Sequence, residues 1–70
     1  MEHTVAIKET HRPDSWVEMA AFLFHADAAW FARHLSNQDP FNRVVRVEGG
    51  KNYVNVYYRH GEELVAEGAE

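Results

Sequence analysis

The stretch Phe22-Leu-Phe-His-Ala-Asp-Ala-Ala-Trp-Phe-Ala-Arg-His-Leu35 says most about the fold of this chain, because it holds six of the nine Phe, Trp and Leu residues. Within it, Ala28, Phe31, Ala32 and Leu35 are spaced at i, i+3, i+4 and i+7, which is one face of an α-helix. The stretch therefore predicts an amphipathic helix whose apolar face needs a second layer. The valine- and tyrosine-rich segments on either side can supply that layer.

The predicted helix runs from about residue 25 or 26 to residue 37. Asp27 falls in its first turn, and Arg33 and His34 fall in its last turn, where each charge suits the helix dipole. The pair Asp39-Pro40 ends the helix, because a residue before proline avoids the helical conformation. The three residues before this pair are expected to fray.

Size and composition allow one small domain. The chain has 70 residues and no cysteine, so no disulfide can reinforce a fold that buries only roughly 60% of its unfolded surface. Apolar residues make up 46% of the sequence and aromatic residues 13%. Because this is more apolar surface than so small a core can hide, we expect the protein to form oligomers.

Charge and hydropathy exclude some classes of protein. The net charge of −4 argues against a protein that lives on nucleic acid, whose phosphate contacts need a basic surface. The sequence contains no apolar run of about 18 residues, so it predicts no membrane span. The first residues lack the basic start and long apolar region of a signal peptide, so we expect a cytoplasmic protein.

Two segments before the helix have strand character. Residues 3–9 alternate, with Val5 and Ile7 on one side, as in a half-buried strand. Residues 16–24 allow two interpretations. Ser15 and Glu18 form a capping box that would start one long helix over 15–37, in a βαββ chain. Dense apolar and aromatic residues favour a strand buried on both faces instead, and we prefer the strand.

Residues 42–59 predict a β-hairpin around the turn Gly49-Gly50. A two-residue turn pairs Arg46 with Tyr53 and Val45 with Val54. By alternation, one face of the hairpin then carries Val45, Val47, Val54, Val56 and Tyr58. The other face carries Val44, Arg46, Tyr53, Asn55 and Tyr57.

The predicted fold is α+β: a single small domain over residues 1–61, ordered β-β-α-β-β, with one helix packed on one face of an antiparallel sheet. Residues 62–70 are acidic and are expected to form a flexible tail.

No constellation of residues predicts catalysis. The five histidines lack the spacing of a metal site, so we expect surface or boundary positions for them and no metal or cofactor. Neither serine has a nucleophile motif. An enzyme would need a pocket lined by His25, His34 or Glu18, which the sequence does not place, so we expect a non-catalytic protein.

The sheet face away from the helix is the predicted contact surface. Its candidate residues are Arg46, Tyr53, Asn55, Tyr57 and Arg59. One alternating set of the preceding strand joins them, either Trp16, Phe22 and Phe24 or Val17, Met19 and Leu23. Such a face suits a homodimer interface rich in Tyr, Trp and Arg. It equally suits stacking of single-stranded nucleic acid or a small ligand. The acidic balance favours two copies meeting face to face, with Tyr53 and Tyr57 at or near the interface.

The run Phe-x-x-x-Ala-Asp-Ala-x-x-Phe-Ala-Arg-x-Leu, from Phe22 to Leu35, continues through Asp39-Pro40 to Arg43-Val-Val-Arg-Val47. This pattern resembles short, uncharacterised bacterial and phage-type proteins of β-β-α-β-β organisation. The resemblance covers about half of the chain and consists of packing positions. It implies the fold and carries over no catalytic or binding residue.

Overall fold

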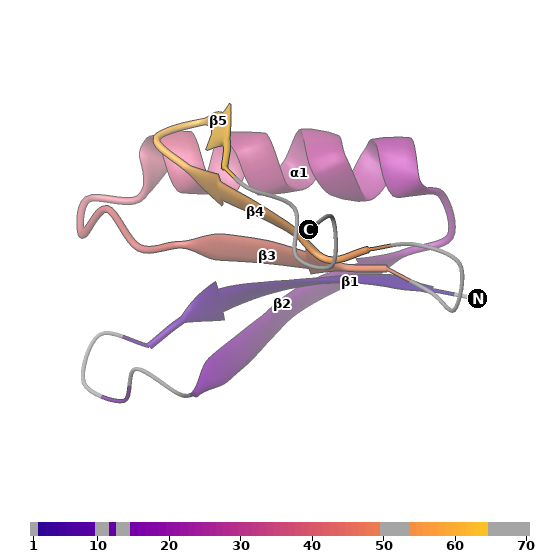
Figure 1. Ribbon diagram of the computed structural model, residues 1–70, viewed down its shortest axis with the longest axis horizontal. Helices are drawn as coiled ribbons and strands as arrows, with labels where there is room; N and C mark the ends of the chain where they lie inside the picture. Colours follow the sequence, from indigo (N-terminus) through magenta and orange to yellow (C-terminus); the bar gives the residue numbers. More distant parts are fainter. Residues whose placement is uncertain (1, 10–11, 13–14, 50–53, 65–70) are drawn as a thin grey trace.

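The computed structural model describes residues 2–9, 12, 15–49 and 54–64. Its elements are β1 (His3–Lys8), β2 (Trp16–Phe22), α1 (His25–Gln38), β3 (Val45–Glu48), β4 (Val56–Arg59) and β5 (Glu62–Glu63). The predicted β-β-α-β-β order is confirmed, and segment 16–22 is a strand rather than the start of a long helix (Figure 1). The short strand β5 follows the four predicted strands.

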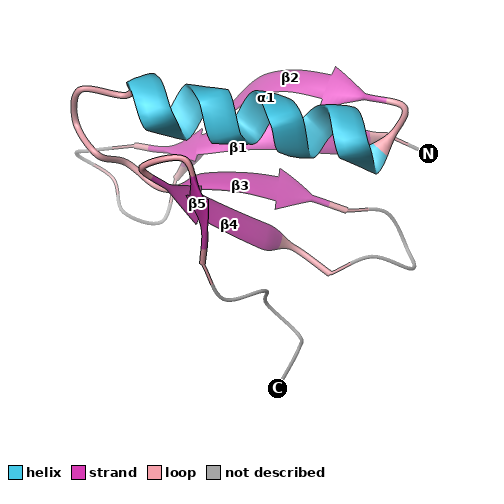
Figure 2. Ribbon diagram, turned by 90° about the horizontal axis from the view of Figure 1, so that it is seen from above, coloured by secondary structure: helices cyan, strands magenta, loops and turns pink. Residues whose placement is uncertain are grey.

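The five strands form one antiparallel sheet in the order β2-β1-β3-β4-β5. The helix crosses one face of this sheet, as seen from above in Figure 2. Helix α1 connects β2 to β3 over that face. The strand after the helix, β3, therefore pairs with β1 rather than with β2. The opposite face has no helix over it (Figure 1).

The core lies between the helix and the inner face of the sheet. Its buried members come from four elements: Val5 and Ile7, Ala28 and Ala32, Val45 and Val47, and Val56 and Tyr58. The strand residues alternate at period two and the helix residues at i and i+4, so both patterns bring apolar side chains to one interface. The two buried alanines let the helix backbone approach the sheet closely, and Phe31 and Leu35 pack at the edge of this core.

The helix ends one residue later than the sequence predicted. It runs through Gln38 and has Asp27 in its first turn, but no basic residue in its last turn. The placement of Arg33 and His34 in that turn was therefore wrong, because the extra length moves both toward the middle of the helix. Asp39 caps the helix in an extended conformation, as predicted. No helix in the described part of the chain is long and apolar enough to cross a membrane.

A β-bulge divides β2 into two halves. Val5 pairs with Ala20, but the next residue of β1, Ala6, pairs with Glu18, so Met19 is the extra residue. The bulge reverses the alternation along the strand. Trp16 and Glu18 therefore lie on the helix-free face, whereas Phe22 lies on the helix face and contacts Phe31 with ring centroids 5.5 Å apart. The sequence analysis expected one of two alternating sets to share a face, either Trp16, Phe22 and Phe24 or Val17, Met19 and Leu23. Neither set shares a face, because each includes residues before and after the bulge.

The register of β3 with β4 also differs from the prediction. Val45 pairs with Tyr58 and Arg46 with Tyr57, four residues farther along than expected. The predicted two-residue turn at Gly49-Gly50 was therefore wrong, since β3 ends at Glu48 and β4 begins only at Val56. Within β3 and β4 the faces are as predicted, because a shift of four residues preserves the alternation. Val54 was expected on the core face, but it lies before β4 and is 43% exposed. The predicted partner of Arg46, Tyr53, lies outside the described residues.

The two-residue turn of this fold connects β4 to β5. His60 and Gly61 both have positive φ, 57° and 78°, as the central residues of a type I′ turn require. The turn returns the chain so that Arg59 pairs with Glu62 and Tyr58 with Glu63. β5 thereby closes one edge of the sheet and packs beside the last part of the helix (Figure 2).

Candidate interaction surface

The helix-free face of the sheet is called the open face here. The strand registers place on it residues of four strands: Thr4, Ala6 and Lys8 of β1, Trp16, Glu18 and Ala21 of β2, Arg46 and Glu48 of β3, and Tyr57 and Arg59 of β4. Directly opposite residues of an antiparallel pair point to the same side, which is why these side chains gather there.

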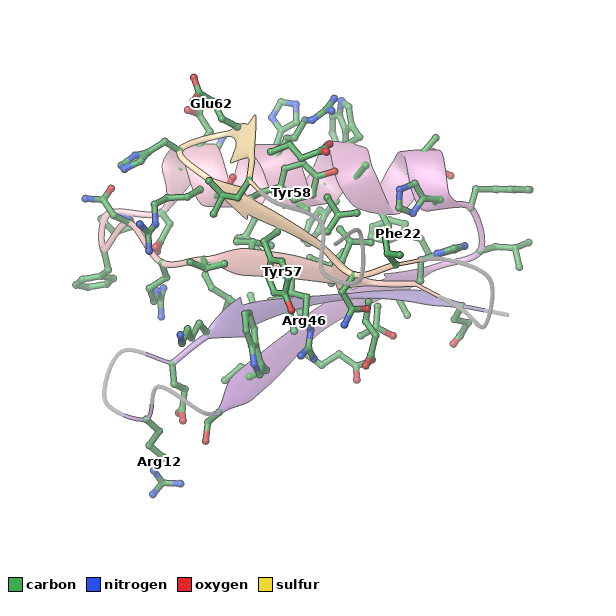
Figure 3. All side chains as sticks on the ribbon, viewed as in Figure 1. Arg12, Phe22, Arg46, Tyr57, Tyr58 and Glu62 are labelled. Atoms are coloured by element: carbon green, nitrogen blue, oxygen red, sulfur yellow. The ribbon has the colours of Figure 1, made fainter. Side chains whose placement is uncertain are left out.

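Three of these side chains form a stacked cluster, namely Trp16, Arg46 and Tyr57. The guanidinium carbon of Arg46 lies 4.5 Å from the centroid of the Trp16 ring, and the rings of Trp16 and Tyr57 are 6.1 Å apart. In Figure 3, Arg46 and Tyr57 lie toward the open face, whereas Tyr58 points to the helix. A cation over an indole at this distance contributes about 0.5–2 kcal/mol, depending on its exposure to water.

The small side chain of Ala6 makes the cluster possible. Ala6 pairs with Glu18 on one side and with Arg46 on the other, so it lies under the middle of the cluster. Although it faces away from the core, only 3% of its surface is exposed. Trp16 from the edge strand and Tyr57 from the fourth strand therefore reach each other above this alanine.

The open face carries both signs of charge. Lys8, Arg46 and Arg59 are cationic, and Glu18 and Glu48 are anionic. The Nε atom of Arg46 is buried and has no hydrogen-bond partner within the described residues. Because this atom has almost no exposed surface, an acceptor from another molecule reaches it only if the neighbouring side chains move.

The structure brings some of the predicted site residues together and separates others. Arg46 and Tyr57 pair directly. Asn55 is half-buried just before β4, and Arg59 is exposed at the far end of that strand beside Glu62. Tyr53 lies outside the described residues. Trp16 was one of two alternatives in the sequence, and only the bulge at Met19 places it in the cluster.

The histidines named as candidates in the sequence, His25 and His34, do not lie in one pocket. His3 is buried against His25, with ring centroids 5.3 Å apart, although the sequence favoured surface or boundary positions. His34 is exposed on the helix and lies 4.2 Å from the ring of Trp30. Glu18 lies on the open face, so His25, His34 and Glu18 share no site. Within the described residues, no group of three or more His, Asp or Glu side chains could hold a metal ion.

A shallow depression of about 280 Å³ lies between the second half of the helix and the β4–β5 turn. It is lined by Arg33, His34, Asn37, His60 and Gly61. All of these except Gly61 are exposed, and Arg33 already lies 4.0 Å from Glu63. Because its cationic groups are solvated and partly neutralised, we assign no ligand to this depression.

Asp39 and Arg43 form a structural ion pair after the helix. Arg43 donates its backbone N–H to Oδ2 of Asp39 at 2.6 Å and its Nη2 to Oδ1 at 2.8 Å. The side-chain hydrogen bonds from Arg43 hold the pKa of Asp39 below its usual value, against the effect of burial. The pair fixes the connection that leads from α1 into β3, and it lies apart from the open face.

Comparison of the chain with protein-family models, with curated proteins and with solved structures gives no significant match.

Proposed function

We propose that this protein is a small, non-catalytic, cytoplasmic interaction module that works as a homodimer, with the stacked cluster at or beside its contact surface. The observation that carries the proposal is the cluster itself. Trp16, Arg46 and Tyr57 lie half-exposed on a sheet face that no helix covers. Tryptophan, tyrosine and arginine are the residues that dominate binding energy at protein interfaces.

Exposed apolar side chains support an interaction role. The described residues include eight large apolar side chains that are exposed: Val17, Met19, Leu23, Phe24, Trp30, Phe41, Val54 and Leu64. Single exposed side chains of this kind are ordinary, but a chain of 70 residues has little surface over which to scatter eight. Contiguous exposed apolar surface normally marks a contact with another molecule.

The mixed charge of the open face favours a second copy over nucleic acid as the partner. A twofold dimer needs a surface that is complementary to itself, which a face with both cations and carboxylates can provide. The carboxylates of Glu18 and Glu48 beside Arg46 would repel the phosphates of a nucleic acid. The net charge of −4 likewise disfavours nucleic acid as the partner.

Light scattering across a series of protein concentrations tests the dimer. We expect a mass near twice 8.1 kDa at high concentration. Trp16→Ala should weaken the dimer, whereas Trp30→Ala, a change of the same size on the exposed side of the helix, should not. A mass of 8.1 kDa at every concentration up to several hundred micromolar would contradict the proposal.

A second function is favoured by the half-exposed side chain of Arg46 and the adjacent aromatic rings. In this alternative, the open face binds single-stranded nucleic acid or a small anionic ligand through stacking and one charge-assisted hydrogen bond. Titration with a single-stranded oligonucleotide at several salt concentrations separates the two functions. Binding that weakens steeply with salt and is lost on Arg46→Ala would favour the alternative.

A further inference from the structure

The two edges of the sheet are protected very differently. The outer strand on one side, β5, has two residues, and both are glutamates. The outer strand on the other side, β2, has seven residues, Trp-Val-Glu-Met-Ala-Ala-Phe, with a single charge and no proline. Short length and charge are the usual means by which proteins prevent edge-to-edge pairing. The β5 edge has both, and β2 has only Glu18 and the bulge at Met19.

Exposed apolar side chains also concentrate at β2. Val17 and Met19 within the strand are 43% and 46% exposed, and Leu23 and Phe24 directly after it are 66% and 64% exposed. Half of the eight large exposed apolar side chains in the described residues thus belong to one strand and its exit. The buried core by contrast involves β1, β3 and β4, so the helix leaves β2 only partly covered.

We propose that a second copy of this chain pairs antiparallel along β2, so that the two five-stranded sheets join into one sheet of ten strands. The inference rests on the homodimer proposed above and specifies which surface forms it. The backbone N–H and C=O groups on the outer side of a strand take another strand as their natural partner. When a twofold axis relates the two copies, a single contact pairs the outer backbone groups of β2 in both copies.

The bulge restricts the register of this pairing. An antiparallel twofold pair of strands keeps the two helices on the same side of the joined sheet, so opposing residues must share a face. Trp16 lies on the open face, as does Ala21, the partner of Thr4; Val17 and Ala20 lie on the helix face. The register that matches these faces sets Trp16 opposite Ala21 of the second copy, and Val17 opposite its Ala20. Each large side chain then faces an alanine.

In this register the axis passes between Glu18 and Met19. Glu18 then faces Met19 of the second copy, so the one charge of the strand meets no like charge. The two bulges come together at the axis, and the stacked clusters of both copies lie on one continuous face. An edge of seven residues buries less than the roughly 800 Å² per partner of a standard interface, so we expect dissociation in the micromolar range.

Changing the charge at residue 19 tests this arrangement, because a negative and a positive side chain there should have opposite effects on the dimer. Met19→Glu places a carboxylate opposite Glu18 twice per dimer, and we expect the dissociation constant to rise about tenfold or more. Met19→Lys places an ammonium group there instead and should keep or tighten the dimer. Val54→Glu, at a residue with the same 43% exposure as Val17, is the control near the other side of the sheet. Sedimentation equilibrium on the full chain measures all three, and melting temperatures confirm that each variant folds.

The outcomes separate the inference from the homodimer on which it rests. A parent protein that stays monomeric contradicts both. A dimer that Met19→Glu and Met19→Lys weaken equally, or leave unchanged, overturns the β2 pairing alone. Arg59→Glu distinguishes the face-to-face arrangement, because Arg59 is exposed on the open face of β4, three strands away from β2. This change should leave a β2-paired dimer intact. Loss of the dimer in folded Arg59→Glu would assign the interface to the open face instead.

Discussion

The backbone N–H of Gly61 donates a hydrogen bond of 2.9 Å to the hydroxyl oxygen of Ser36, 25 residues earlier in the chain. The same hydroxyl donates to the carbonyl oxygen of Arg33 at 3.1 Å, so one serine links the helix backbone to the β4–β5 turn. Ser36 is 1% exposed, on the face of the helix that also holds Ala28 and Ala32. This contact attaches the last strands to the helix.

Ser36→Ala should therefore destabilise the fold by about 1–2 kcal/mol, because it leaves the partly buried N–H of Gly61 without its acceptor. Urea denaturation measures the loss, and hydrogen exchange should show faster exchange of the Gly61 amide in particular. Gln38→Ala, on an exposed residue of the same helix, is the control. Equal stability of parent and Ser36→Ala would show that water replaces the hydroxyl at no cost.

Gly61→Ala should be more costly than an ordinary surface change, for two separable reasons. A Cβ at this position meets Cβ of Asn37 at 3.1 Å, and the φ of 78° disfavours any side chain. We expect a loss of about 1–2 kcal/mol from the left-handed conformation together with the close contact. In the background of Asn37→Gly, which removes the neighbouring Cβ and with it the close contact, Gly61→Ala should still cost about 1 kcal/mol. A cost that vanishes there would mean that the φ carries no strain.

Asp39→Asn should reveal a pH-dependent contribution to stability. The pKa of Asp39 is lowered in the folded state by its hydrogen bonds with Arg43, so its contribution is full above the ordinary pKa of 3.8 and is lost as the pH falls through the lowered folded value. At pH 7 the variant should be about 1–2 kcal/mol less stable than the parent. The two stability curves should converge in strong acid. A difference that stays constant from pH 7 to pH 2 would contradict this assignment.

Phe31→Ala should remove a contact at the edge of the core rather than its centre. Phe31 packs on Phe22 with ring centroids 5.5 Å apart and is only partly buried. Truncation of a fully buried phenylalanine costs about 3–5 kcal/mol, so we expect about 2–3 kcal/mol here. Thermal unfolding measures the loss. Phe41→Ala, at a residue that is 66% exposed, should leave the melting temperature nearly unchanged.

The helix and the strands could be predicted from the sequence alone. The i, i+3, i+4 spacing of Ala28, Phe31 and Ala32 and the alternation around Val5 and Val45 depend only on residues a few positions apart. Such short-range patterns set which side of a helix or strand is apolar, and the structure confirms both the helix face and the strand faces. The predicted strand over residues 16–24 is confirmed for residues 16–22. Its expected burial on both faces was wrong, because β2 is an edge strand whose residues are exposed or half-buried.

The alignment of strands with one another depended on the tertiary structure. A slip of four residues between β3 and β4 leaves every side chain on its face, so alternation could not detect it. The bulge at Met19 and the cluster over Ala6 depend on how β2 pairs with β1, and the bulge places Trp16 on the open face. Likewise, the buried role of Ser36 exists only because the β4–β5 turn returns to the helix. The sequence by itself thus determined the elements and their apolar faces, because these follow from neighbours in the chain. The tertiary structure decided which residues meet, because registers and bulges are set by contacts between segments far apart.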